Sequence, residues 1–276
     1  MDASGLFWIF FILMSLQPLL AQRVQDSMRQ RKIADIERRR KSRVILLVHR
    51  QETMRLLGFP MMRYIDLNDS EEVLRAIHTT DPEMPLDLIL HTPGGLVIAA
   101  AQIARALKSH KGTVTVFVPH YAMSGGTLIA LAADQIVMSP HAVLGPVDPQ
   151  LNGMAAASIL KVGEKKEPKD IDDKTIMLMD LSGKAVRQLR HIVTEILTPE
   201  MAEDAAAALA DKLTTGQWTH DYAITCTEAA TLGLNVSTDI PQTVLDLMTL
   251  YRQPVRGGAP SVEYLPRRYE RAGASR

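Results

Sequence analysis

Cysteine is nearly absent from the chain, since Cys226 is the only one in 276 residues. One cysteine forms no internal disulfide and cannot build a cysteine-rich metal site, so we expect a small buried apolar residue and no bound metal. The chain also lacks a net charge, because 31 basic residues balance 31 acidic ones. This balance gives no electrostatic argument for a nucleic-acid partner. No Gly-x-Gly-x-x-Gly motif follows a predicted strand, so no nucleotide or other cofactor is expected.

Apolar residues are plentiful, at 46% of the chain, and are enough for one large core. Short apolar runs, typical of strands buried on both faces, alternate with segments of helical periodicity. Strands are predicted at 44–48, 86–90, 114–118, 135–138 and 143–144. Helices are predicted at 69–79 with Asp69 in the cap, and at 96–108, 124–133, 172–197, 199–213 and 241–251. This alternation predicts βαβ crossovers, and hence an α/β fold with a mainly parallel sheet.

Residues 1–22 predict a membrane anchor. The run at 6–21 reads LFWIFFILMSLQPLLA and carries no charge. Extended back to residue 4, it has about 18 residues, close to the roughly 20 that cross the hydrocarbon core. A cleaved signal peptide is the rival interpretation. It is disfavoured because no lysine or arginine precedes the apolar run and because Leu19-Leu20-Ala21 is a poor cleavage site.

A basic segment at 23–43 follows the anchor and holds nine lysine or arginine residues against three acidic ones. The positive-inside rule places this segment, and the domain at 44–251 behind it, in the cytoplasm of a single-pass membrane protein. We expect the segment to be helical, and either to bind anionic membrane lipids or to act as a charged spacer. The stretch at 252–276 is rich in glycine, proline and arginine, which predicts a disordered basic tail.

Two glycine turns, each following a predicted strand, carry the candidate chemistry. In His91-Thr92-Pro93-Gly94-Gly95 the glycines let backbone N–H groups point at a ligand without a Cβ in the way. Ser124-Gly125-Gly126 puts a hydroxyl at a helix N-terminus, where free N–H groups stabilise developing negative charge. Taken singly, each motif is usually an ordinary turn or cap. Together they predict a nucleophile beside an oxyanion hole, as acyl transfer requires.

The stretches DLILHTPGGLVIAAAQIARAL and MSGGTLIALAADQIVMSPHAVLGPVDPQ carry a resemblance to a known family. They resemble the Clp-fold peptidases, and among these the serine dehydrogenase proteinase family, membrane-anchored relatives of signal peptide peptidase A and of the Clp proteolytic subunit. The resemblance covers about residues 43–250 and includes a final EAATLGL segment at 228–234. It implies a ClpP/crotonase-like fold with repeated ββα and βαβ units. It also implies Ser124 as the nucleophile, with an oxyanion hole from the amides of Gly94 or Gly95 and of Gly125.

The general base stays open between lysine and histidine. Where the Clp subunit has the histidine of its Ser-His-Asp triad, this sequence has Asp148. Signal peptide peptidase A uses a lysine further downstream, and Lys161 and Lys165 fall in that window; burial, which a lysine base needs, is easiest for Lys161 because an apolar run precedes it. His220 lies near the place of the Clp aspartate, and Asp148 would then orient it. A chain with no competent base is the remaining alternative.

Three functions are compatible with these features. The first is an ATP-independent serine endopeptidase that hydrolyses peptides or membrane proteins near the membrane. The second is a non-catalytic membrane scaffold on the same fold. The third is an acyl-CoA enzyme of the crotonase type, ranked last because it leaves Ser124 without a role. Clp-fold proteins assemble into rings or stacked trimers, so we expect a homo-oligomer by analogy, with the helices at 172–213 as an interface.

Overall fold

The computed structural model of the chain describes residues 3–49 and 63–251, and every side chain at 22–49 and 63–251. The predicted tail at 252–276 lies outside the described residues, and so do most side chains of the predicted anchor at 1–22. Across the part that is described, no helix is both long enough and apolar enough to cross a membrane.

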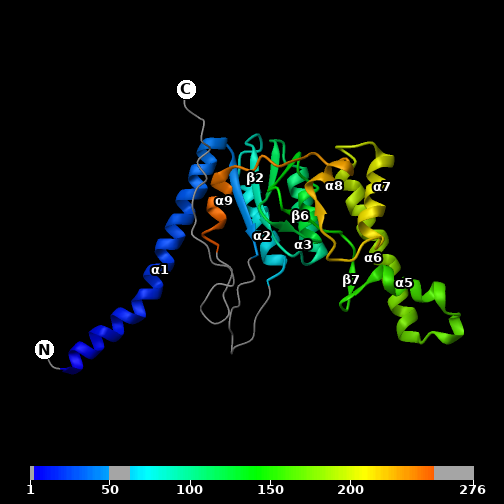
Figure 1. Cartoon of the computed structure of the whole chain (residues 1–276), viewed down its shortest axis with the longest axis horizontal. Coiled ribbons are helices and arrows are strands. Elements are labelled where there is room, and N and C mark those ends of the chain that lie inside the picture. The colour runs from blue at the N-terminus through cyan, green and yellow to red at the C-terminus, as the bar shows by residue number, and fades with distance from the viewer. Residues whose placement is uncertain (1–2, 50–62, 252–276) are drawn as a thin grey trace.

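A five-stranded parallel sheet forms the centre of the molecule (Figure 1). Its strand order is β1-β2-β3-β5-β10, and every neighbouring pair is parallel. The strands are β1 (Arg43–Val48), β2 (Leu86–His91), β3 (Val114–Val118), β5 (Gln135–Met138) and β10 (Val236–Ser237). The register places Leu88 between Ile45 and Val116. The predicted α/β fold with a mainly parallel sheet is confirmed.

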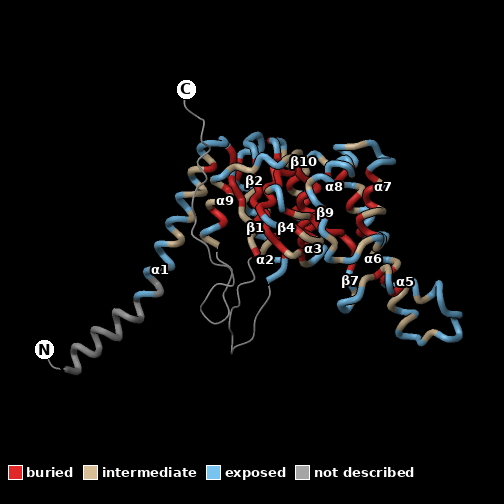
Figure 2. The backbone as a smooth tube through the Cα atoms, viewed as in Figure 1, coloured by how far each residue is buried: buried red, intermediate tan, exposed pale blue. Residues whose placement is uncertain are grey.

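The two faces of this sheet pack into two separate cores. Along β2, Leu86, Leu88 and Leu90 join one core and Ile89 joins the other, as the two-residue period of a strand requires. The first core is covered by α2 (Leu67–His78), α3 (Val97–Lys108), α4 (Gly125–Ala130), α6 (Asp173–Leu197) and α7 (Glu203–Thr214). Figure 2 shows the buried residues gathered in this central layer. Burial on both faces explains why the strands read as continuous apolar runs.

The second core is closed by the ends of the described chain, α1 (Ala3–Arg40) and α9 (Gln242–Met248). Helix α1 is continuous through the predicted anchor and the basic segment, and it projects from the domain (Figure 1). Its C-terminal part is docked: Ile36 is fully buried, and the side chains of Gln25 and Arg29 donate to the carbonyl oxygen of Leu250 at 2.7 and 2.9 Å. The basic segment is therefore an integral part of the domain rather than only a spacer.

Smaller elements surround the sheet. β4 (Tyr121–Ala122), β6 (Val143–Leu144) and β9 (Ile224–Thr225) form a second sheet, and β7 (Gln150–Leu151) pairs with β8 (Met154–Ala155). An arm made of α5 (Ala156–Lys165), the 3₁₀ turn η1 (Pro168–Asp170) and the first half of α6 extends from the domain (Figure 1). Helix α8 (Cys226–Thr231) precedes β10. Cys226, expected to be buried, is only half-buried, and desolvation raises the pKa of its thiol.

The cap predicted for the helix at 69–79 is wrong by three residues. Helix α2 begins at Leu67, and Asp66 is its N-cap. Asp66 Oδ1 accepts the N–H of Asp69 at 3.0 Å, while Asp69 Oδ2 accepts the N–H of Asp66 at 2.9 Å. Asp69 is thus the third-position partner of a capping box, and its carboxylate lies against the start of the helix.

Candidate active site

Ser124 lies at the turn between β4 and α4, immediately before the first helical residue. Its backbone adopts φ 50° and ψ −116°, in the left-handed half of conformational space, where a residue with a Cβ is strained. Two hydrogen bonds fix the turn: Met123 N–H donates to Thr92 O at 3.0 Å, and Leu128 N–H donates to Ser124 O at 3.1 Å. All six residues of α4 are buried, so packing holds the helix, and the strained residue before it, in a fixed position. Such a strand-turn-helix junction is a known way to present a nucleophilic hydroxyl.

The two predicted glycine turns meet at Ser124, with no room for side chains on them. A Cβ on Gly94, whose φ is +105°, would lie 2.8 Å from the Cβ of Ser124. A Cβ on Gly95 would lie 2.2 Å from the carbonyl oxygen of Ile65, and one on Gly126 would lie 2.5 Å from Cγ2 of Thr92. Glycine is required at all three positions because the backbones approach closely there.

The amides of the two turns differ in what they contact. The N–H of Gly94 donates to Oγ1 of Thr92 at 3.2 Å. The amides of Gly95 and Gly125 have no hydrogen-bond acceptor among the residues that the structure describes. They are neighbours, because a Cβ on Gly125 would lie 3.5 Å from the nitrogen of Gly95. Of the alternatives left open by the sequence, Gly95 and Gly125 thus have the unoccupied donors.

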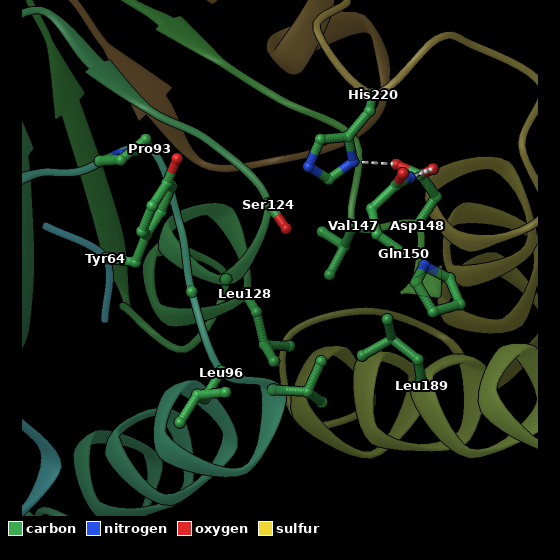
Figure 3. Close-up of a pocket in the computed structure, with 14 residues that line it drawn as sticks. Tyr64, Pro93, Leu96, Ser124, Leu128, Val147, Asp148, Gln150, Leu189 and His220 are labelled. Atoms are coloured by element: carbon green, nitrogen blue, oxygen red, sulfur yellow. Dashed lines mark hydrogen bonds and ion pairs between the residues drawn. The ribbon is translucent and has the colours of Figure 1, made fainter. Parts of the chain in front are cut away.

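A cavity of about 320 Å³ opens beside Ser124 (Figure 3). Both glycine turns line it, and most of the remaining wall is apolar, including Tyr64, Leu96, Leu128, Val147 and Leu189. Within residues 3–49 and 63–251, Asp148 is the only acidic residue that lines the cavity and His220 the only basic one.

Asp148 and His220 form a pair, although 72 residues separate them in the chain. Nδ1 of His220 lies 2.7 Å from Oδ1 of Asp148, and Oδ2 of Asp148 accepts Nε2–H of Gln150 at 2.6 Å. The hydrogen bond to Asp148 raises the pKa of His220 above its usual value; the charges of Asp148 and Asp221 add to this, and desolvation opposes it. In Figure 3 the second ring nitrogen of His220 lies on the side of the ring away from Asp148, toward Ser124. Among the described residues, this ring makes no hydrogen bond to the Ser124 hydroxyl.

The structure does not bring the lysine candidates into the cavity. Lys161 lies in α5 and Lys165 ends that helix; both side chains are exposed, and neither lines the cavity. The burial considered for Lys161 is wrong, because Ala156 and Ile159 form the buried face of α5. An exposed ammonium lacks the desolvation that makes a lysine a base near neutral pH.

Sequence reasoning missed two side chains next to the site. Gln150, which holds the second oxygen of Asp148, follows it by only two residues, and this short spacing was a usable signal. His49 contacts Thr92 in the first glycine turn, although 43 residues separate them. Its position directly after the first strand gave no indication of this contact.

Comparisons with known proteins show the family of this chain. The sequence profile of the ClpP-like SDH-type serine proteinase family matches residues 2–275. The uncharacterized protein MJ1495 of Methanocaldococcus jannaschii is 48% identical over 265 residues, which cover 96% of this chain and 90% of that protein. Among solved structures, ClpP1 from Listeria monocytogenes is 15% identical, with a TM-score of 0.45 over 82% of this chain and 99% of that one. The 1510-N membrane-bound stomatin-specific protease is 21% identical, with a TM-score of 0.44 over 67% and 79%. The chain belongs to the ClpP-like SDH-type serine proteinase family.

Proposed function

We propose that the chain is a membrane-anchored serine endopeptidase whose catalytic groups are Ser124, His220 and Asp148. The observation that carries this proposal is that one cavity holds the strained serine, the His–Asp pair and two unoccupied backbone amides. These are the nucleophile, the oriented base and the oxyanion donors of acyl transfer. Asp148 stands where the Clp subunit has its histidine, and His220 lies near the place of the Clp aspartate. In this proposal the two residue types have therefore exchanged places along the chain.

The geometry supports a two-step hydrolysis. Asp148 accepts the Nδ1 proton of His220, which leaves the lone pair of Nε2 available to take the proton of the Ser124 hydroxyl. Ser124 Oγ then bonds to the peptide carbonyl carbon, and the amides of Gly95 and Gly125 bind the oxyanion. His220 gives its proton to the departing amine, leaving an acyl ester on Ser124. Water, deprotonated by His220, hydrolyses the ester to a carboxylic acid and regenerates the serine.

The charge of the cavity favours internal peptide bonds. An exopeptidase needs a charged group to capture a chain terminus, whereas the acidic and basic side chains of this cavity, Asp148 and His220, are paired with each other. Apolar walls at Leu96, Leu128 and Leu189 suit an apolar substrate side chain. Peptide hydrolysis is downhill, so the proposal assigns no role to ATP in cleavage.

The anchor in this proposal is the uncharged run at 6–21. Helix α1 carries it without a break into the docked basic segment, in which Gln25 donates a hydrogen bond to the domain at Leu250. At a rise of about 1.5 Å per residue, the four helical steps from residue 21 to Gln25 span only about 6 Å. A domain held this near the membrane suits substrates at the membrane surface, with the basic residues of α1 facing anionic headgroups on the cytoplasmic side.

The arm is our proposed contact between copies of the chain. Helix α6 exposes large apolar side chains there, with Met177 64% and Leu181 51% exposed. Their four-residue spacing places them on one face of the helix. Exposed apolar groups gathered on a protruding helix are typical of a protein interface. We expect Met177→Asp to dissociate a homo-oligomer in detergent, measured by light scattering, and an unchanged mass would argue against this interface.

A fluorophosphonate probe tests the proposed activity directly. The full chain in detergent should be labelled, and Ser124→Ala should abolish the label, because the probe phosphonylates an activated serine. Ser158→Ala, at an exposed serine of α5, is the matched control and should keep full labelling. A protein that stays folded and membrane-associated without any labelling would instead be the non-catalytic scaffold. Binding of coenzyme A in place of labelling would indicate a crotonase-type enzyme.

A further inference from the structure

A second His–Asp pair lies behind the first glycine turn. His49 follows β1 and is buried, with only 4% of its surface exposed. Its Nε2 lies 3.2 Å from Oδ2 of Asp69, and its Nδ1 lies 2.9 Å from Oγ1 of Thr92. None of these three side chains lines the cavity beside Ser124, and the mechanism above does not use them.

Thr92 connects this pair to both glycine turns. Its hydroxyl accepts the N–H of Gly94 at 3.2 Å, and its methyl group is the atom that a Cβ on Gly126 would meet at 2.5 Å. Its backbone bonds to the strand that leads into Ser124: the N–H of Thr92 donates to Tyr121 O at 3.2 Å, and its carbonyl oxygen accepts the N–H of Met123 at 3.0 Å. One residue thus sets the position of the first turn relative to the nucleophile.

The chemistry of Asp69, His49 and Thr92 indicates which of them donates in each hydrogen bond. The desolvation of Asp69 acts to raise its pKa, but the hydrogen bonds from His49 and Asp66 and the charges of His49 and Arg63 outweigh it, so the pKa lies below its usual value. The carboxylate therefore accepts the Nε2 proton of His49. In the tautomer with its proton on Nε2, His49 accepts the Thr92 hydroxyl at Nδ1, and the oxygen of Thr92 keeps a lone pair for the N–H of Gly94.

We propose that Asp69, His49 and Thr92 position the oxyanion turn, with Thr92 holding the Gly94 amide so that the adjacent Gly95 amide faces the cavity as the oxyanion donor. This rests on the proposed serine peptidase activity. None of the three touches the substrate: Asp69 fixes the tautomer and ring of His49, and His49 fixes the hydroxyl of Thr92. Buried hydrogen-bond partners of this kind orient the groups that do the chemistry.

The comparison of Thr92→Val with Thr92→Ser tests the hydroxyl. Valine keeps the shape of threonine and removes the acceptor of the Gly94 amide, whereas serine keeps that acceptor and removes the methyl group. Loss of one oxyanion donor costs about 10²–10³-fold in rate, so we expect a displaced turn to slow phosphonylation of Ser124 by about 10–100-fold in Thr92→Val and far less in Thr92→Ser. The probe concentration at half-maximal rate should not change. Equal maximal rates for the two variants would overturn the proposal.

His49 offers a second matched pair, which separates its two contacts. The amide oxygen of asparagine overlays Nδ1 and retains an acceptor for Thr92, whereas the amide nitrogen of glutamine overlays Nε2 and retains a donor for Asp69. The proposal predicts that His49→Asn is phosphonylated faster than His49→Gln, with melting temperatures that differ little. The opposite order would mean that His49 acts through Asp69 and not through Thr92.

Amide hydrogen exchange tests the same positions without any activity, in the full-length Ser124→Ala chain. Thr92→Val should speed exchange at Gly94 by about 10-fold or more, the ratio that loss of roughly 1.4 kcal/mol produces, and Thr92→Ser should not. Unchanged exchange at Gly94 would overturn the proposal even if the protein proved inactive. If the wild type is never labelled, the proposed peptidase activity fails, and the exchange data alone decide whether Thr92 holds the turn.

Discussion

Two His–Asp pairs flank the first glycine turn, and they differ in what surrounds the imidazole. The side chain of His220 is 38% exposed and uses Nδ1 for Asp148, and its other ring nitrogen has no partner among the described residues. The side chain of His49 is 5% exposed, and both of its ring nitrogens are occupied, by Asp69 and by Thr92. The same two residue types can therefore serve proton transfer in one place and positioning in the other.

In our proposal a free ring nitrogen, and not the pair itself, distinguishes the base from the positioning histidine. A histidine whose two nitrogens are both bonded has no lone pair for a substrate proton, whatever its charge. It can still fix the orientation of its partners, because a buried hydrogen bond has few alternatives. The following expectations test this distinction, beginning with the largest effect.

Removal of His220 should have the largest effect. We expect His220→Ala to slow phosphonylation of Ser124 by about 10⁴-fold or more, as loss of the base does in serine proteases. The exposed His141 supplies a control, since His141→Ala should leave the rate unchanged. A His220→Ala protein that reacts within 10-fold of the wild-type rate would show that another group is the base.

Changing the aspartate of each pair to asparagine should distinguish the base from the positioning histidine by the pH dependence of the rate. In the proposed mechanism His220 acts as a base when neutral, so we expect the rate to fall as pH drops below its raised pKa. Asp148→Asn removes the hydrogen bond and charge that raise this pKa; we expect the acidic limb of the pH–rate profile to move to lower pH, and the maximal rate to fall by about 10²–10⁴-fold.

Asp69→Asn should leave that acidic limb in place. Its expected effects are a smaller drop in maximal rate and a melting temperature lower by about 2–6 °C, because the cap of α2 and the support of His49 are both weakened. A shifted limb in Asp69→Asn, or an unshifted one in Asp148→Asn, would assign the roles the other way round.

The free energy of unfolding should also depend on pH through His220, with a smaller effect. Its pKa is raised by folding, so its contribution is fully present below the unfolded value of 6.5 and is lost as pH rises through the folded value. The urea midpoint of the wild type relative to His220→Gln should therefore decrease between pH 6 and pH 8. The half-exposed position limits the size of this change. A wild-type advantage that grows with pH would contradict the direction of the shift.

The smallest effects are expected at the lysines. Lys161→Ala and Lys165→Ala should change the phosphonylation rate by less than about twofold, because both side chains are exposed and lie outside the cavity. A loss comparable with that of His220→Ala in either variant would show that this lysine is the general base.

The sequence predicted the sheet well because its strands are buried on both faces and read as continuous apolar runs. The strands at 114–118, 135–138 and 143–144 were predicted with the observed bounds. The glycine turns were predictable for a related reason: close backbone contact, such as that of Gly95 with Ile65, tolerates only glycine and leaves a visible motif.

The rest of the site depends on contacts that no local pattern encodes. The pairing of Asp148 with His220 spans 72 residues, so the sequence could offer His220 only as one base among several. Lys161 shows the converse, since an apolar run before it suggested burial, but the helical period turned its side chain to solvent. His49 was not considered at all, because its partners come from α2 and from the turn after β2.

A crystal structure of the phosphonylated protein would test the central claim most directly. The account predicts that Nε2 of His220 lies about 2.6–3.2 Å from Oγ of Ser124 or from an oxygen of the phosphonyl group, with Nδ1 still bonded to Asp148. It also predicts that the amides of Gly95 and Gly125 donate to one phosphonyl oxygen. A lysine ammonium in the place of His220, or a Gly95 amide turned away from the phosphonyl group, would contradict it.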